Sequence, residues 1–89
     1  MTWALEVSSA FERDYRKHCA KNATFRQAVD NKVAQVLQQP TRYKPLRKPM
    51  QGRRRVHVMG SFVIVFRVVE AERVVQLLRL AHHDEAYGP

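Results

Sequence analysis

The sequence has little cysteine, little acid and no long apolar run. Cys19 is the one cysteine among 89 residues, which excludes an internal disulfide and favours a reducing compartment. No apolar stretch approaches the roughly 20 residues that cross a bilayer, and the N-terminal "MTWALEVSS" lacks the basic and apolar regions of a signal peptide. We therefore expect a cytoplasmic protein without disulfides or a membrane anchor.

The remaining composition is sufficient for one folded unit. A chain of this length can bury roughly 60% of its unfolded surface in one core. Its 45% apolar and 27% charged residues are typical of globular rather than disordered proteins. We expect a single domain that covers residues 1–89.

The shortage of acid leaves a strongly basic chain. Lysine and arginine number 16 against 8 acidic residues, for a formal net charge of +8, and such an excess attracts polyanions. The segment from Arg42 to Arg55, "RYKPLRKPMQGRRR", contains seven of these basic residues and no acid. Three interpretations stay open: a solvated loop, a nucleic-acid surface, or a docking site for an acidic partner protein.

The first half of the chain predicts a strand followed by two helices. "WALEV" alternates apolar and polar residues, as a strand over residues 3–7 would. Each helix is expected to open with a capping signature, Ser9 with Glu12 for the first and Thr24 with Gln27 for the second. The second helix has an apolar stripe of helical period, formed by Phe25, Ala28, Val29, Val33, Val36 and Leu37.

The second half changes to the period of β-structure. "RRVHV", "FVIVFRVV" and "RVVQLLRLA" predict three strands joined by short turns, and the second run is apolar enough for a central strand. The element order is β-α-α-β-β-β. We expect an α+β fold in which the two helices pack on one face of a small, mainly antiparallel sheet.

Histidine is the residue type that points to chemistry. Arg55 and His57 are two apart in a strand, so their side chains emerge on one face, which the apolar neighbours place away from the helices. His82 and His83 follow the last strand, and in extended chain one of them would share the face of His57. Tyr87 adds an aromatic ring four residues after His83. These residues form our candidate catalytic group.

Cleavage of RNA without a metal uses these residue types. A base takes the proton of the ribose 2′-OH, cations stabilise the pentacoordinate phosphate, and an acid protonates the departing 5′-oxygen. Histidine can serve as acid or base near neutral pH, and arginine binds phosphate through paired donors. We assign RNA binding to the basic residues around the candidate group and to the second adjacent histidine: Lys44, Arg47, Lys48, Arg53, Arg54 and His82.

A metal site and a nucleophilic cysteine or serine are both disfavoured by the sequence. "HHD" offers ligand types, but neighbours in sequence do not usually converge on one ion, and the HExxH and CxxC spacings are absent. Cys19 lies within a predicted helix, and no serine occupies a GxSxG elbow. We expect no metal and no cofactor.

From residue 44 onward the sequence resembles the RelE/ParE superfamily of toxins from type II toxin–antitoxin systems. The resemblance is carried by "PL" at 45 and 46, by the glycine and basic residues before "RVHV", by the "FVIVF" strand, and by a near-terminal histidine with an aromatic residue four positions later. It implies a ribosome-dependent mRNA endonuclease with a fold like that of small microbial ribonucleases, no cofactor, and an acidic antitoxin as partner.

Within the superfamily the chain is most similar to the YafQ-like branch. That likeness places roles on His57, His83 and Tyr87, with Arg54 or Arg55 near the phosphate. The sequence departs from the pattern at Lys44, where that branch often has histidine, and at Ser61, where it has aspartate. Two alternatives therefore stay open: a ParE-like toxin that poisons DNA gyrase, and a decayed toxin that only binds antitoxin or RNA.

Overall fold

A computed structural model of the chain describes residues 3–43, 45 and 52–86. Within these ranges no helix is both long and apolar enough to span a membrane. The described residues form four strands, three α-helices and two short 3-10 turns. These are β1 (Ala4–Val7), α1 (Ser9–Cys19), α2 (Ala23–Gln38), a turn at Pro40–Arg42, β2 (Arg54–Val58), β3 (Phe62–Val69), a turn at Glu70–Glu72, β4 (Val74–His82) and α3 (His83–Ala86).

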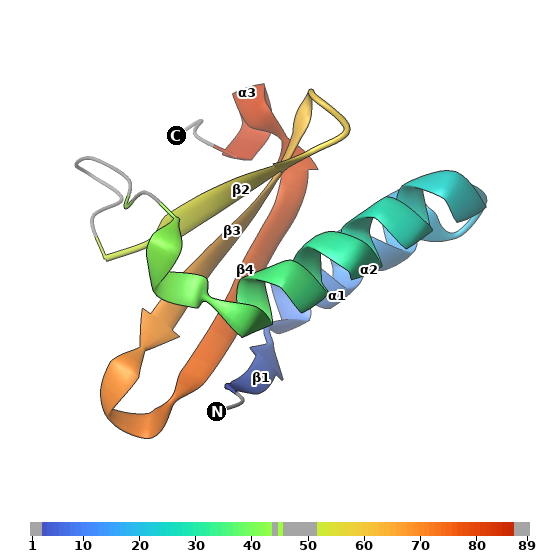
Figure 1. Cartoon of the computed structure of the whole chain (residues 1–89). Coiled ribbons are helices and arrows are strands. Elements are labelled where there is room, and N and C mark those ends of the chain that lie inside the picture. Colours follow the sequence, from blue (N-terminus) through green and yellow to red (C-terminus); the bar gives the residue numbers. More distant parts are fainter. Residues whose placement is uncertain (1–2, 44, 46–51, 87–89) are drawn as a thin grey trace.

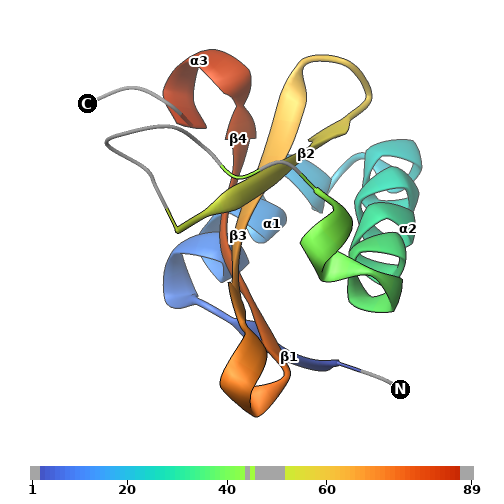
Figure 2. The same ribbon diagram turned by 60° about the vertical axis from the view of Figure 1, so that its left-hand side comes forward.

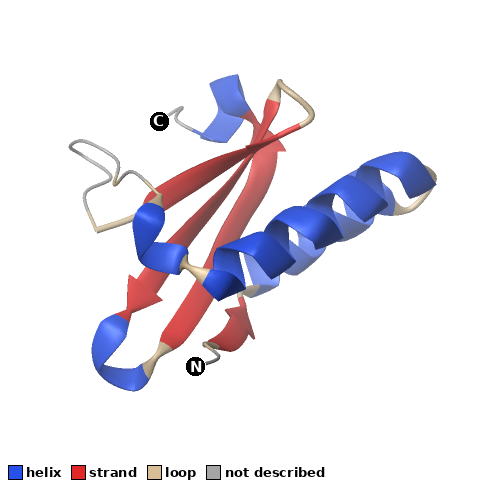
Figure 3. Ribbon diagram, viewed as in Figure 1, coloured by secondary structure: helices blue, strands red, loops and turns tan. Residues whose placement is uncertain are grey.

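The strands form one sheet in the order β1-β4-β3-β2. β1 runs parallel to β4, and the other neighbouring strands are antiparallel. The long helices α1 and α2 lie together against one face of this sheet (Figures 1 and 3). The predicted α+β architecture is therefore confirmed, whereas the short helix α3 was not predicted.

The central strand β3 is buried on both of its faces. Ile64 and Phe66 point into the main core, which α1 and α2 cover with buried apolar side chains, while Val63 and Val65 form a second, smaller cluster with Ala81 on the opposite face. All four of these β3 side chains are fully buried. The near-continuous apolar run that predicted a central strand is thus explained by burial on two sides.

Both long helices begin at caps that lie before the predicted ones. The Ser8 hydroxyl, not that of Ser9, accepts the N–H of Phe11 at 3.0 Å, and it also donates to the carbonyl of Leu78 at 3.1 Å. Asn22, rather than Thr24, accepts the N–H of Phe25 at 2.9 Å. The expected capping position was therefore wrong by one residue for α1 and by two residues for α2. The side-chain oxygens that accept these N–H groups belong to Ser8 and Asn22, and not to the residues that the local motif favours.

Asp14 on α1 closes the edge of β4 beyond the segment that β1 pairs with. One carboxylate oxygen, Oδ2, accepts the N–H of Leu80 at 2.9 Å and the Nε of Arg79 at 2.8 Å. The hydrogen bond to Asp14 raises the pKa of the Arg79 guanidinium. This contact satisfies an otherwise unpaired edge group, and it fixes α1 against the end of β4 that precedes His82.

The Ser8 contacts predict a measurable loss of stability. Ser8→Ala removes both the helix cap and the bond to Leu78, so we expect the free energy of unfolding to fall by about 1–2 kcal/mol. Ser9→Ala is the matched control: Ser9 is an exposed residue in the first turn of α1, and its loss should cost under about 0.5 kcal/mol. Urea denaturation followed by circular dichroism measures both, and equal stabilities would contradict the assignment.

Candidate functional site

β2 places His57 on the face of the sheet that lies away from α1 and α2, called here the open face. Val56 and Val58 point into the helix-side core, so Arg55 and His57, which alternate with them, lie on the open face. His57 is exposed and Arg55 is half-buried. His57 pairs with Val63 of β3, which in turn pairs with Ala81 of β4. The prediction that His57 lies away from the helices is confirmed.

Arg54, assigned above to RNA binding, lies on the other side of the strand and is held by the chain itself. Its Nη1 donates to the carbonyl of Tyr43 at 2.7 Å and to that of Thr41 at 3.3 Å. The guanidinium therefore fixes the segment that follows α2 to the start of β2. The period-two alternation places Arg54 opposite to Arg55 and His57, and its assignment to RNA binding stays a prediction.

Arg53 and Arg67 bring further positive charge to the open face. Both are exposed, and together with Gly52, Gln76 and Leu78 they line a shallow hollow of about 330 Å³. Arg67 was missing from the sequence-based set. It alternates with Val63 and Val65 along β3, so the same period-two rule that placed His57 would have placed it on this face.

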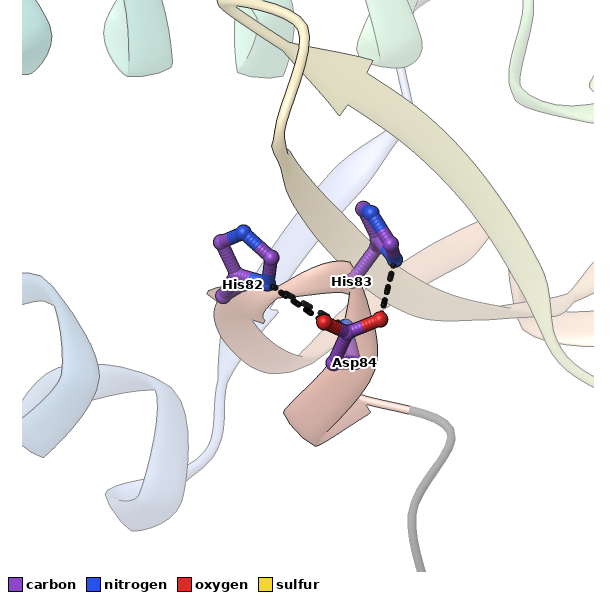
Figure 4. Close-up of side chains that lie close together, drawn as sticks. All are labelled: His82, His83 and Asp84. Atoms are coloured by element: carbon purple, nitrogen blue, oxygen red, sulfur yellow. Dashed lines mark hydrogen bonds and ion pairs between the residues drawn. The ribbon is translucent and has the colours of Figure 1, made fainter.

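His82, His83 and Asp84 form a compact cluster at the junction of β4 and α3 (Figure 4). The two imidazole ring centres are 4.7 Å apart with a tilt of 31°. Nδ1 of His83 is 2.9 Å from Oδ1 of Asp84, and Nδ1 of His82 is 3.7 Å from Oδ2. The backbone N–H of Asp84 also donates to Nδ1 of His82 at 3.3 Å. Asp84 thus contacts both histidines.

This geometry corrects the expectation that the adjacent histidines face opposite ways. That rule applies to extended chain, but β4 ends at His82 and α3 begins at His83. The change in backbone direction between them brings the two rings side by side. Asp84 was missing from the sequence-based set; the signal was the "HHD" triplet, which the sequence analysis set aside because neighbours in sequence do not usually converge on one ion.

The cluster is anchored to both neighbouring parts of the fold. The ring of His82 packs against that of Phe62, with ring centres 5.9 Å apart. The ring centre of Phe62 is also 5.0 Å from that of His18 of α1 and 4.8 Å from that of Phe25 of α2. The N–H of His83 donates to the carbonyl of Ser61, in the turn between β2 and β3, at 2.9 Å.

His57 and the cluster therefore lie at the same end of the sheet. β2 ends one residue after His57, and Phe62 at the start of β3 pairs with both Val58 and His82. In Figures 1 and 2 this is the end at which the β2–β3 turn and α3 meet.

Several predicted site residues lie outside the described part of the chain, namely Lys44, Arg47, Lys48 and Tyr87. Their roles stay predictions. Cys19 is described and is buried, and burial raises the pKa of its thiol, which opposes the formation of a thiolate.

A second surface is an apolar groove of about 600 Å³ between β1, α1 and α2. Leu5 and Val7 of β1 line it and are 42% and 41% exposed. Tyr15 also lines it and donates to Asp30 Oδ1 at 2.8 Å; burial, together with this bond, raises the pKa of the Tyr15 hydroxyl. β1 is an edge strand of the sheet, so the groove adjoins unpaired backbone.

Comparison with known families identifies the chain. The family model described as the ParE toxin of type II toxin–antitoxin systems, parDE, matches residues 5–87. The chain belongs to the RelE/ParE superfamily of type II toxins. The putative toxin RelE4 of Methanocaldococcus jannaschii is 31% identical over 85 residues, which cover 96% of this chain and 90% of that protein. A Methanosarcina mazei protein is 35% identical over 83 residues, 93% of this chain and 96% of that protein.

Solved structures of superfamily members have the same fold. The YoeB/ParE toxin from Agrobacterium tumefaciens superposes with a TM-score of 0.80 at 15% identity, covering 90% of this chain and 98% of that one. The toxin–antitoxin complex DinJ–YafQ of E. coli contains a chain with a TM-score of 0.78 at 15% identity, covering 99% of this chain and 100% of that one. The superfamily fold expected from the sequence is thus confirmed.

The structural role of Arg54 can be tested by comparing it with the neighbouring Arg53. Arg54→Ala removes charged donors from the carbonyls of Thr41 and Tyr43, so we expect about 1–2 kcal/mol of destabilisation. Arg53→Ala, the exposed control, should change stability by under about 0.5 kcal/mol. Denaturant titrations of the two variants measure the difference. Wild-type stability of the Arg54→Ala protein would show that the two carbonyl contacts are unimportant.

Proposed function

We propose that this toxin is an endoribonuclease that cleaves messenger RNA on the ribosome and thereby inhibits translation. The observation that carries the proposal is the 2.9 Å contact between Nδ1 of His83 and Oδ1 of Asp84, at the end of the sheet where His57 lies. A carboxylate on one ring nitrogen orients an imidazole and leaves the other nitrogen for proton transfer.

The proposed reaction is a metal-independent attack within the RNA chain. One imidazole removes the proton of the ribose 2′-OH, and the oxygen bonds to phosphorus. The bond from phosphorus to the 5′-oxygen then breaks, and the second imidazole supplies the proton to the leaving oxygen. His57 and His83 are the two residues proposed for these steps. The products would be a 2′,3′-cyclic phosphate and a 5′-hydroxyl end.

Positive charge on the open face supports binding of the RNA backbone. Arg55 lies on the same face as His57, where it is proposed to stabilise the charge of the pentacoordinate phosphate. Arg53 and Arg67 extend the positive charge toward the shallow hollow. From the resemblance, Tyr87 is proposed to stack a base, and His82 and the basic segment are proposed to contact the RNA strand through Lys44, Arg47 and Lys48.

Replacing either proposed acid–base residue should abolish toxicity. We expect His83→Ala and His57→Ala each to lower mRNA cleavage by about 10²–10⁴-fold, the usual contribution of one general acid or base. Growth after induction without antitoxin, together with primer extension on a translated message, measures the effect. Glu70→Gln, on an exposed turn, is the control and should retain full toxicity. Undiminished cleavage by both histidine variants would refute the mechanism.

The matching family model favours one alternative, a ParE-like toxin that acts on DNA gyrase. The same induction experiment separates the two functions. Intact messages with induction of the DNA-damage response would favour gyrase as the target, whereas cleaved messages without that response would favour RNA. A protein with neither effect would be a binding module, for which the histidine variants should behave like the wild type.

We further propose that an acidic antitoxin neutralises the toxin and occupies the apolar groove. The fold matches chains solved in toxin–antitoxin complexes. The net charge of +8 favours an acidic partner, and exposed apolar side chains beside an edge strand fit an amphipathic segment. We also propose that the protein acts in the cytoplasm, because the ribosomes of the proposed function are found there.

The groove proposal predicts a local loss of antitoxin affinity. Leu5→Asp places a charge in the groove and should weaken binding about tenfold or more. Met59→Asp is the control because Met59 is a large exposed apolar residue, 60% accessible, in the turn at the far end of the sheet. Calorimetry with the small acidic protein encoded beside the toxin measures both. Equal affinities for the two variants would place the antitoxin elsewhere.

A further inference from the structure

We propose that His82, His83 and Asp84 form a binding site for a divalent transition-metal ion of the zinc type. Each residue offers one donor atom, and the three atoms lie within 4.8 Å of one another. Among the residues that the structure describes, no other group of three or more His, Cys, Asp or Glu residues converges in this way. The objection that sequence neighbours cannot share an ion fails here because the chain changes direction after His82.

The donor spacing allows the three side chains to reach one ion after rotation. A tetrahedral zinc ion has its ligands about 2.0–2.2 Å away, so the ligands are about 3.3 Å from one another. Nδ1 of His83 is 2.9 Å from Oδ1 of Asp84 and Nδ1 of His82 is 3.7 Å from Oδ2, and one donor atom from each residue lies within 4.8 Å of the other two. The three solvent-accessible side chains would rotate about their single bonds to bring the donors to the tetrahedral separation.

The surrounding fold holds the ligands in place before an ion binds. His82 is paired with Phe62 in the sheet and its ring packs on the Phe62 ring. The backbone of His83 is fixed by its bond to Ser61. Nδ1 of His82 also accepts the N–H of Asp84 at 3.3 Å, a bond that the ion would have to replace. A preformed set loses less conformational entropy on binding.

The chemistry of the donors selects the class of ion. Two imidazole nitrogens and one carboxylate oxygen suit zinc, copper and nickel, whereas calcium and magnesium prefer oxygen ligands. The side chains of His82, His83 and Asp84 are 39%, 45% and 77% exposed, so an ion can enter from solvent and retain water in its remaining positions. It would replace the contact between Nδ1 of His83 and Oδ1 of Asp84.

The ion would act as an inhibitor rather than as a cofactor, an effect that rests on the proposed nuclease function. A metal on Nδ1 of His83 takes the place of the Asp84 contact, withdraws the ring from proton transfer, and adds positive charge to a group that must accept protons. Metal binding itself does not depend on the nuclease assignment, because the same three donors are present whether or not the toxin cleaves RNA.

Calorimetric titration of tag-free, chelator-treated protein with Zn²⁺ tests the site, and Co²⁺ absorption bands report its ligands. We expect one ion per chain. Loss of an outer-shell partner lowers metal affinity about tenfold or more, and loss of a direct ligand should lower it at least as much. We therefore expect His82→Ala and Asp84→Asn each to bind Zn²⁺ at least about tenfold more weakly than the wild type. Glu85→Gln and His57→Ala are the controls and should bind Zn²⁺ as the wild type does.

Two results would overturn the proposal: no Zn²⁺ or Co²⁺ binding by the wild type, or wild-type affinity in both His82→Ala and Asp84→Asn. A cleavage assay on the wild type then addresses the consequence separately. Saturating Zn²⁺ should abolish cleavage, and a chelator should restore it. Binding without any cleavage activity would refute the nuclease function and leave the metal site intact, whereas cleavage without binding would do the reverse.

Discussion

The burial of β3 on both faces is the constraint on which the rest of the structure depends. Ile64 and Phe66 require the helix layer on one side, while Val63 and Val65 require cover on the other. A strand with two apolar faces is stable only in the interior of a sheet, so β2 and β4 must flank it. The two segments that contain the histidines are thereby placed on either side of the same strand.

The change in chain direction after β4 brings His82, His83 and Asp84 together on that framework. Continued as a strand, His82 and His83 would emerge on opposite faces. The bond from the N–H of His83 to the carbonyl of Ser61 instead holds the chain at the β2–β3 turn, and α3 begins there. Asp84 can then reach both rings.

Local patterns predicted the strands well and the helix ends poorly, for a physical reason. "RRVHV" and "FVIVFRVV" matched β2 and β3 in full, because alternation and β-branched content are properties of each segment itself. The cap of α1 depends on Ser8, whose hydroxyl also bonds Leu78 at a separation of 70 residues. No local motif contains that information. Strand alternation alone, by contrast, is enough to place Arg54 and Arg67 on opposite faces of the sheet.

The same donor atoms support two uses that exclude each other. Proton transfer is favoured by an imidazole whose Nδ1 is held by a carboxylate, and the His83–Asp84 contact has that geometry. A metal ion binds through the lone pairs of the same ring nitrogens and carboxylate, so it competes with protons for these atoms. Because His82 brings a second imidazole to the same carboxylate, the cluster offers more donors than one acid–base residue requires. This second imidazole is what the proposed metal site uses beyond the proposed catalytic pair.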